Sequence, residues 1–115
     1  MERHCLFADR PLAEFVKWVE LVVDAINSSL EGIDPTRVRL HVCWGNYPGP
    51  HNRDLPLRDL IDLIYGIHAN GLSLEGANPR HEHEWTVFAE SPLPAGKGLI
   101  PGVIDTCTNY IEHPE

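Results

Sequence analysis

A histidine and a cysteine separated by one residue, His41 and Cys43, end a short apolar segment of the chain. The segment from Val38 to Cys43 is rich in apolar and β-branched residues, which predicts a buried strand. Because strand side chains alternate between two faces, the imidazole and the thiol should point the same way at the strand's carboxyl end. Nitrogen and sulfur donors placed in this way can bind a metal ion, although a core histidine beside a buried cysteine is the commoner arrangement.

A carboxylate occupies the corresponding place on the next predicted strand. This strand, Gly71 to Glu75, follows a turn at Asn70-Gly71 and ends in an acid that is surface decoration in most proteins. Imidazole nitrogen, thiolate sulfur and carboxylate oxygen are ligand types that zinc accepts, and a catalytic zinc keeps a further position for water or substrate. A mixed set of this kind in a reduced compartment favours zinc over copper or iron. His41, Cys43 and Glu75 are therefore candidate zinc ligands.

Helices and strands are predicted to alternate along the chain. Apolar residues at three-and-four spacing predict a helix from Leu12 to Leu30, and two more helices are expected from Asp54 to Gly66 and from Asn78 to Phe88. A third strand is expected from Leu99 to Ile104. This order predicts parallel β/α units whose sites lie at the carboxyl ends of the strands. Three strands cannot close a barrel of eight, which takes about 250 residues, so we predict the α/β class, as part of a TIM (β/α)8 barrel or a small open sheet, with residues 1–115 as one domain.

Composition narrows the function classes. The chain has 17 acidic and 9 basic side chains and a formal charge of -8, so we expect no nucleic-acid partner. No apolar run approaches the roughly 20 residues of a membrane span and the N-terminus lacks a signal-peptide pattern, so we expect no membrane partner and a cytoplasmic location. The cysteines at positions 5, 43 and 107 are too few for a disulfide framework and are expected to be reduced thiols.

A small open sheet would also leave strand edges unpaired. Unpaired edges favour pairing with a second chain, so self-association is a further possible partner interaction.

Three motifs, Leu40 to Tyr47, Leu74 to His81 and Ile100 to Asp105, occur in a recognisable order. Together they resemble the C-terminal catalytic barrel of cobalamin-independent methionine synthase, and more closely its short bacterial relatives. The similarity extends from about Phe7 to Glu115. In that family the histidine and cysteine of His-x-Cys and the glutamate at the end of the next strand bind zinc. The resemblance thus implies that the three candidate ligands named above hold a zinc ion.

The resemblance also implies a reaction. The family transfers a methyl group from 5-methyltetrahydrofolate, usually its polyglutamate form, to homocysteine in methionine biosynthesis, without a corrinoid. A free thiol has a pKa of roughly 8.5 and is mostly protonated at neutral pH, whereas a thiol bound to a metal is deprotonated. Zinc would therefore supply a nucleophile, and an acid must protonate the folate nitrogen as it leaves. The implied partners are a small-molecule thiol and a methyl donor, and a relative acting on another thiol, such as a coenzyme thiol, is an alternative.

Two departures from the family qualify this expectation. The family's fourth zinc ligand is a cysteine on a later strand and has no counterpart before Glu115, and Cys107 stands where full-length synthases carry a histidine proton donor. Asp105 and Cys107 are the candidate catalytic residues. For Asp105 the alternative is a cap at the end of the strand. Cys107 could instead replace the missing zinc ligand, which is a less favoured role. A truncated, non-catalytic fragment is the alternative function.

The loop after the first strand contributes the candidate substrate-binding residues, Trp44, Asn46 and Tyr47. Aromatic rings in such a loop can stack on a pterin or simply cover the core, and covering the core is the commoner role. His51 and the segment His81 to Glu84 are placed where they can reach the site. A solvent-exposed helix face accounts for the alternating histidines and acids of that segment equally well.

Overall fold

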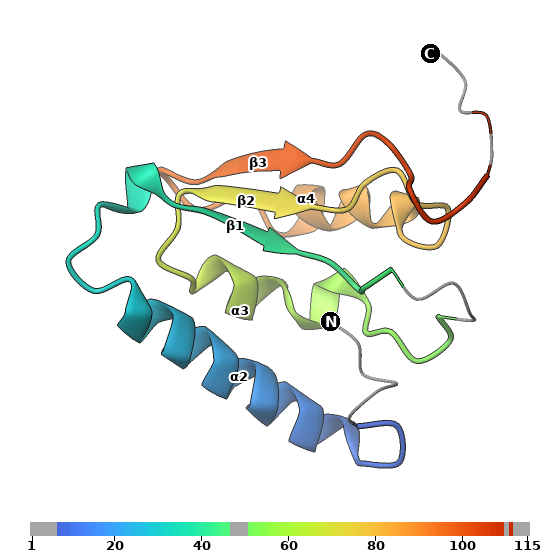
Figure 1. Ribbon diagram of the computed structural model, residues 1–115, viewed down its shortest axis with the longest axis horizontal. Helices are drawn as coiled ribbons and strands as arrows, with labels where there is room; N and C mark the ends of the chain where they lie inside the picture. The colour runs from blue at the N-terminus through green and yellow to red at the C-terminus, as the bar shows by residue number, and fades with distance from the viewer. Residues whose placement is uncertain (1–6, 47–50, 110, 112–115) are drawn as a thin grey trace.

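Three parallel strands form the sheet of this protein (Figure 1). They are β1 (Arg39–Val42), β2 (Gly71–Leu74) and β3 (Gly98–Pro101), in the spatial order β1-β2-β3. The structure is a computed structural model that describes residues 7–46, 51–109 and 111. An α/β fold with a small open parallel sheet is confirmed, and the connections from the end of one strand to the start of the next pass through helices.

The first helix is the element that its sequence pattern predicts best. Helix α2 (Leu12–Ser29) begins at the predicted residue and ends one residue before the predicted end, and its buried residues Phe15, Val19 and Val23 are four positions apart, so they share one face. Gly32, with φ 78°, lies in the left-handed region just after the helix, where a residue without a Cβ is favoured. The chain then enters a short 3-10 turn, η1 (Pro35–Arg37), which leads into β1.

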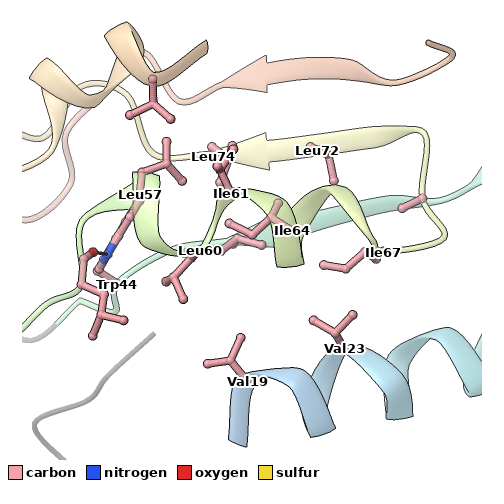
Figure 2. Packing of buried hydrophobic residues seen from close by; sticks show 14 of the residues in the cluster. Val19, Val23, Trp44, Leu57, Leu60, Ile61, Ile64, Ile67, Leu72 and Leu74 are labelled. Atoms are coloured by element: carbon pink, nitrogen blue, oxygen red, sulfur yellow. Dashed lines mark hydrogen bonds between the residues drawn. The ribbon is translucent and has the colours of Figure 1, made fainter. Parts of the chain in front are cut away.

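The second predicted helix is split into η2 (Leu57–Asp59) and α3 (Ile61–Tyr65). These elements lie between α2 and the strands, and Figure 2 shows Val19 and Val23 of α2 on one side and Leu72 and Leu74 of β2 on the other. Ile64 and Leu60 are 0% and 1% exposed, so this helix forms the centre of the hydrophobic core. Trp44 lies beside Leu57 at the carboxyl end of the sheet (Figure 2).

The third predicted helix begins later than its sequence suggests. The helical residues are η3 (Glu82–Thr86) and α4 (Val87–Glu90), whereas Asn78 and Pro79 lie in an irregular loop. Asn78 does cap a turn, because its Oδ1 accepts a hydrogen bond from the Arg80 N–H at 3.0 Å. The Glu75 carboxylate binds the two backbone N–H groups at the start of this turn, those of Ala77 and Asn78.

The strands cover one face of the sheet with apolar side chains and leave the other open. Leu40, Leu72 and Leu99 are aligned across the three strands and pack on or against the core. His41, Ser73 and Ile100 are aligned on the opposite face, and Ile100 is 40% exposed. Strand β3 ends at Pro101, three residues earlier than predicted, and the Gly102 N–H donates a last hydrogen bond to the Leu74 carbonyl.

No helix within the described part of the chain combines the length and the apolar character needed to cross a membrane.

Candidate functional site

A small pocket lies where the segments after the three strands meet. Its volume is about 20 Å³, enough for roughly one water-sized group. The predicted site residues among its walls are Cys43, Trp44, Asn46, Glu75 and Cys107. Its other walls are formed by Gly45, His51, Asn78, Arg80 and His81. Most of the residues predicted from different parts of the sequence therefore share one location.

Cys107 and Asn46 join the segment after β3 to the segment after β1. The Cys107 thiol donates a hydrogen bond to Asn46 Oδ1 at 3.3 Å. Cys43 and Cys107 are both half-buried, and Cys107 is a free thiol, as the low cysteine count predicts. Two further predictions, the thiol of Cys5 and substrate binding by Tyr47, fall outside the described residues.

Glu75 holds the loop that follows β2. Its Oε1 accepts hydrogen bonds from the Ala77 and Asn78 N–H groups at 2.7 and 3.0 Å. Both of these bonds use the same oxygen, so Oε2 is the atom that could bind a cation. Close approach of the next segment requires Gly76, because a Cβ at this position would lie 2.9 Å from the Gly102 carbonyl oxygen.

Asp105 organises the segment after β3. Its Oδ1 accepts bonds from Asn78 Nδ2 at 3.1 Å and from the Cys107 N–H at 2.9 Å, and its Oδ2 accepts a bond from the Thr108 hydroxyl. The Thr108 hydroxyl and then the Cys107 N–H lower the pKa of this carboxyl below its ordinary value of 3.8. A carboxylate that stays ionised accepts protons poorly and positions its neighbours instead, which is the strand-end role considered for it.

His41 lies away from this pocket. It occupies the open face of β1, and its Nδ1 is 3.2 Å from Ser73 Oγ. The ligand atoms of His41, Cys43 and Glu75 are not gathered within 4.8 Å of one another, as a preformed metal site in the described residues would be. Cys43 and Glu75 share the pocket, and binding of zinc by all three residues stays a prediction.

A larger cavity of about 260 Å³ separates β1 from α2. His41 and Cys43 lie on its wall, and the rest of the wall is apolar. The remaining residues around it are Trp18, Val19, Val22, Val23, Ile26, Leu40, Val42 and Ile67. Cys43 therefore lies between an apolar cavity and a polar pocket.

Two histidines that the sequence placed within reach of the site, His51 and His81, line this pocket together and form a group with Asp54, which the sequence did not single out. His51, Asp54 and His81 place one ligand atom each within 4.8 Å of one another, an arrangement that could hold a metal ion. Asp54 Oδ2 is 2.5 Å from His51 Nδ1 and 3.2 Å from His81 Nε2. The three side chains are only 5%, 3% and 10% exposed, in that order. The group is therefore buried, unlike the clusters of charged side chains that are common on protein surfaces.

Two short turns and one aromatic ring position this group. His51 and Asp54 are joined by a backbone bond from the Asp54 N–H to the His51 carbonyl, and His81 and Glu84 are joined in the same way. The Trp44 ring stacks on the His81 ring, with centroids 4.2 Å apart and planes at 15°. His81 and Glu84 are therefore buried, and the prediction of a solvent-exposed helix face is wrong for them. It holds for Glu82 and His83, which lie between them and are exposed.

Comparison with protein-family models, curated proteins and solved structures found no match. Family membership and activity are therefore proposals, supported by the three sequence motifs and by the residues at the carboxyl edge of the sheet.

Proposed function

We propose that this chain is the zinc-binding, thiol-activating part of an S-methyltransferase resembling cobalamin-independent methionine synthase. Its strands would belong to a (β/α)8 barrel of that family. One observation carries the proposal: Cys43, Glu75 and Cys107 follow three successive parallel strands and line one pocket. Parallel α/β folds bind their ligands at this edge, and the three motifs that support the resemblance end here.

The donor set fits zinc. Cys43 offers a thiolate, Glu75 offers its Oε2, and His41, which lies in β1 two residues before Cys43, offers an imidazole nitrogen. His41 would have to exchange its bond with Ser73 for the metal. Because this histidine is exposed, losing that hydrogen bond costs only about 0.5–1.5 kcal/mol, which is small beside typical zinc-binding free energies of about 10 kcal/mol or more.

The residues around the pocket have separate tasks in this proposal. Zinc, when bound, would hold the thiol substrate as its thiolate. Asp105, held ionised by its hydrogen bonds, fixes the segment that carries Cys107. The Asn46 side chain orients the Cys107 thiol, because its Oδ1 accepts a hydrogen bond from that thiol. Cys107 is the candidate donor of the proton that the leaving nitrogen needs.

Metal analysis tests the ligand assignment. We expect Cys43→Ser and His41→Ala to lower the zinc content by about one equivalent per chain, with His83→Ala as a control because His83 is exposed and close in sequence to the site. The same proteins should be assayed for methylation of homocysteine and of coenzyme-type thiols with 5-methyltetrahydrofolate. Full zinc content in both variants would overturn the assignment, and the preferred thiol in the panel would identify the substrate class.

A second candidate function, association with another copy of the chain, is favoured by a different observation. Ile100, Val103 and Ile104 are 40%, 74% and 67% exposed along and beyond β3, a strand that pairs with β2 on only one side. We expect light scattering to report a dimer and the double variant Val103→Glu/Ile104→Glu to be monomeric. A monomer at all concentrations for the wild-type chain would exclude this function.

A further inference from the structure

We propose that His51, Asp54 and His81 form a second metal site, one for a divalent transition-metal cation and without a sulfur ligand. Two imidazole nitrogens and one carboxylate are a ligand set that zinc, cobalt(II) and iron(II) accept, and three protein ligands leave a position open for water or substrate. The ligand atoms already lie within 4.8 Å of one another. This site does not depend on the zinc ligands or the methyl transfer proposed above.

Both ring nitrogens of His81 face a carboxylate, an arrangement that favours a cation beside the ring. Its Nδ1 is 3.1 Å from Glu84 Oε2 and its Nε2 is 3.2 Å from Asp54 Oδ2, so each ring nitrogen faces a carboxylate oxygen. A neutral imidazole carries one N–H and cannot donate to both. The arrangement therefore needs one more positive partner, either a second proton shared with one of the two carboxylates or a metal ion between His81 and Asp54. A metal ion at that place would also bind His51 Nδ1, which is 2.5 Å from the same Asp54 oxygen.

Burial of Asp54 supports the metal over the proton. Its side chain is 3% exposed, and its Oδ1 has no hydrogen-bond partner among the described residues. A buried carboxylate with an unsatisfied oxygen is costly, and buried charges are usually paired or bound to a metal. A divalent cation brings two positive charges to the carboxylate and can bind both of its oxygens, whereas one shared proton brings a single charge and reaches only Oδ2.

Glu84 presents His81 to the metal. A histidine ligand typically donates its second ring N–H to a carboxylate, which fixes the tautomer and the ring orientation. Glu84 takes this place at His81 Nδ1, and its other oxygen is held by the Leu57 N–H at 2.7 Å. The stacked ring of Trp44 fixes the plane of the imidazole. His81 Nε2 is thereby aimed at Asp54 before any metal arrives.

The site opens toward the candidate zinc pocket. His51 and His81 line the same small cavity as Cys43 and Glu75, so a metal ion held by the two histidines would be in reach of a ligand in that cavity. Its water or substrate position would then adjoin the thiol site. The two metal centres differ in one measurable property, since only the Cys43 site contains sulfur.

Anaerobic cobalt(II) titration of the Cys43→Ser chain tests this site by itself. We expect about one equivalent of Co²⁺ to bind with visible ligand-field bands and without a sulfur-to-cobalt charge-transfer band. Glu84→Gln, which keeps an oxygen near His81, should weaken binding by about 10- to 100-fold, and His81→Asn should abolish it. His83→Asn, two residues away and exposed, is the matched control.

Three outcomes of these titrations would overturn the proposed second metal site. Absence of cobalt bands in the folded Cys43→Ser chain would overturn it, as would equal affinity in Glu84→Gln or a sulfur charge-transfer band for the bound ion. If circular dichroism shows that His81→Asn does not fold, His51→Gln replaces it as the ligand variant. Loss of zinc at Cys43 and loss of cobalt at His81 are separate readouts, so failure of either proposal leaves the other standing.

Discussion

Replacing Trp44 by alanine is expected to lower the free energy of unfolding by about 3–5 kcal/mol. The side chain is 4% exposed, belongs to the core cluster, and donates its indole N–H to the Leu55 carbonyl at 2.9 Å. Truncation would open a cavity, leave the Leu55 carbonyl unpaired and remove the ring stacked on His81. Urea denaturation monitored by circular dichroism measures the change.

Trp85→Ala is the matched control, because that ring is 69% exposed and its loss should change stability by about 0.5 kcal/mol or less. Trp44→Phe should fall between the two, since it keeps an aromatic ring over His81 but loses the donor to Leu55. A loss of less than about 1 kcal/mol in Trp44→Ala would contradict the buried position. Such a result would favour the predicted substrate contact as the main role of this ring.

Asp54→Ala is expected to destabilise the protein by about 3–5 kcal/mol, the cost of removing one partner from a buried charged network. The Asp54 carboxylate lies between two histidines, and it is the group that joins the segment after β1 to the start of η3. Without it, His51 and His81 remain buried without their shared acceptor. Denaturation in urea at neutral pH, in metal-free buffer, gives the value.

Asp59→Ala removes an exposed acid from the neighbouring 3-10 turn and should be nearly neutral. An Asp54→Ala chain as stable as this control would show that the group contributes nothing to the fold. Asp54→Asn distinguishes charge from hydrogen bonding, because it keeps an acceptor of the same shape. We expect it to lose less stability than Asp54→Ala.

The first helix and the parallel pairing of the strands were predictable from the sequence, because apolar periodicity and the alternation of helices and strands decide them. The spacing of Phe15, Val19 and Val23 describes one face of a helix whatever surrounds it, and strands separated by helices pair in parallel. The start of the third helix was predicted too early. Asn78 caps a turn through its bond from the Arg80 N–H, and the helical residues begin only at Glu82. Residue type does not separate the two cases, because asparagine favours both turns and helix N-caps.

The candidate site was predictable in part. Residues placed just after the predicted strands, such as Cys43, Glu75 and Cys107, lie at one edge because parallel strands end together. His51 and His81 were placed near the site, but their grouping with Asp54 and its burial were missed, because these depend on Trp44 and on the Leu57 N–H, both contributed by other segments. One signal was present: a histidine is followed three residues later by an acid at His51-x-x-Asp54 and again at His81-x-x-Glu84.

Zinc X-ray absorption of the His81→Asn chain loaded with one equivalent of zinc tests the central claim most directly, because that variant removes a ligand of the second site. We predict a zinc–sulfur distance of about 2.3 Å that disappears in the His81→Asn/Cys43→Ser double variant, and a second sulfur when the thiol substrate is added. A shell of nitrogen and oxygen alone, unchanged by the loss of Cys43 or by added thiol, would contradict the proposal that Cys43 holds a thiol-activating zinc.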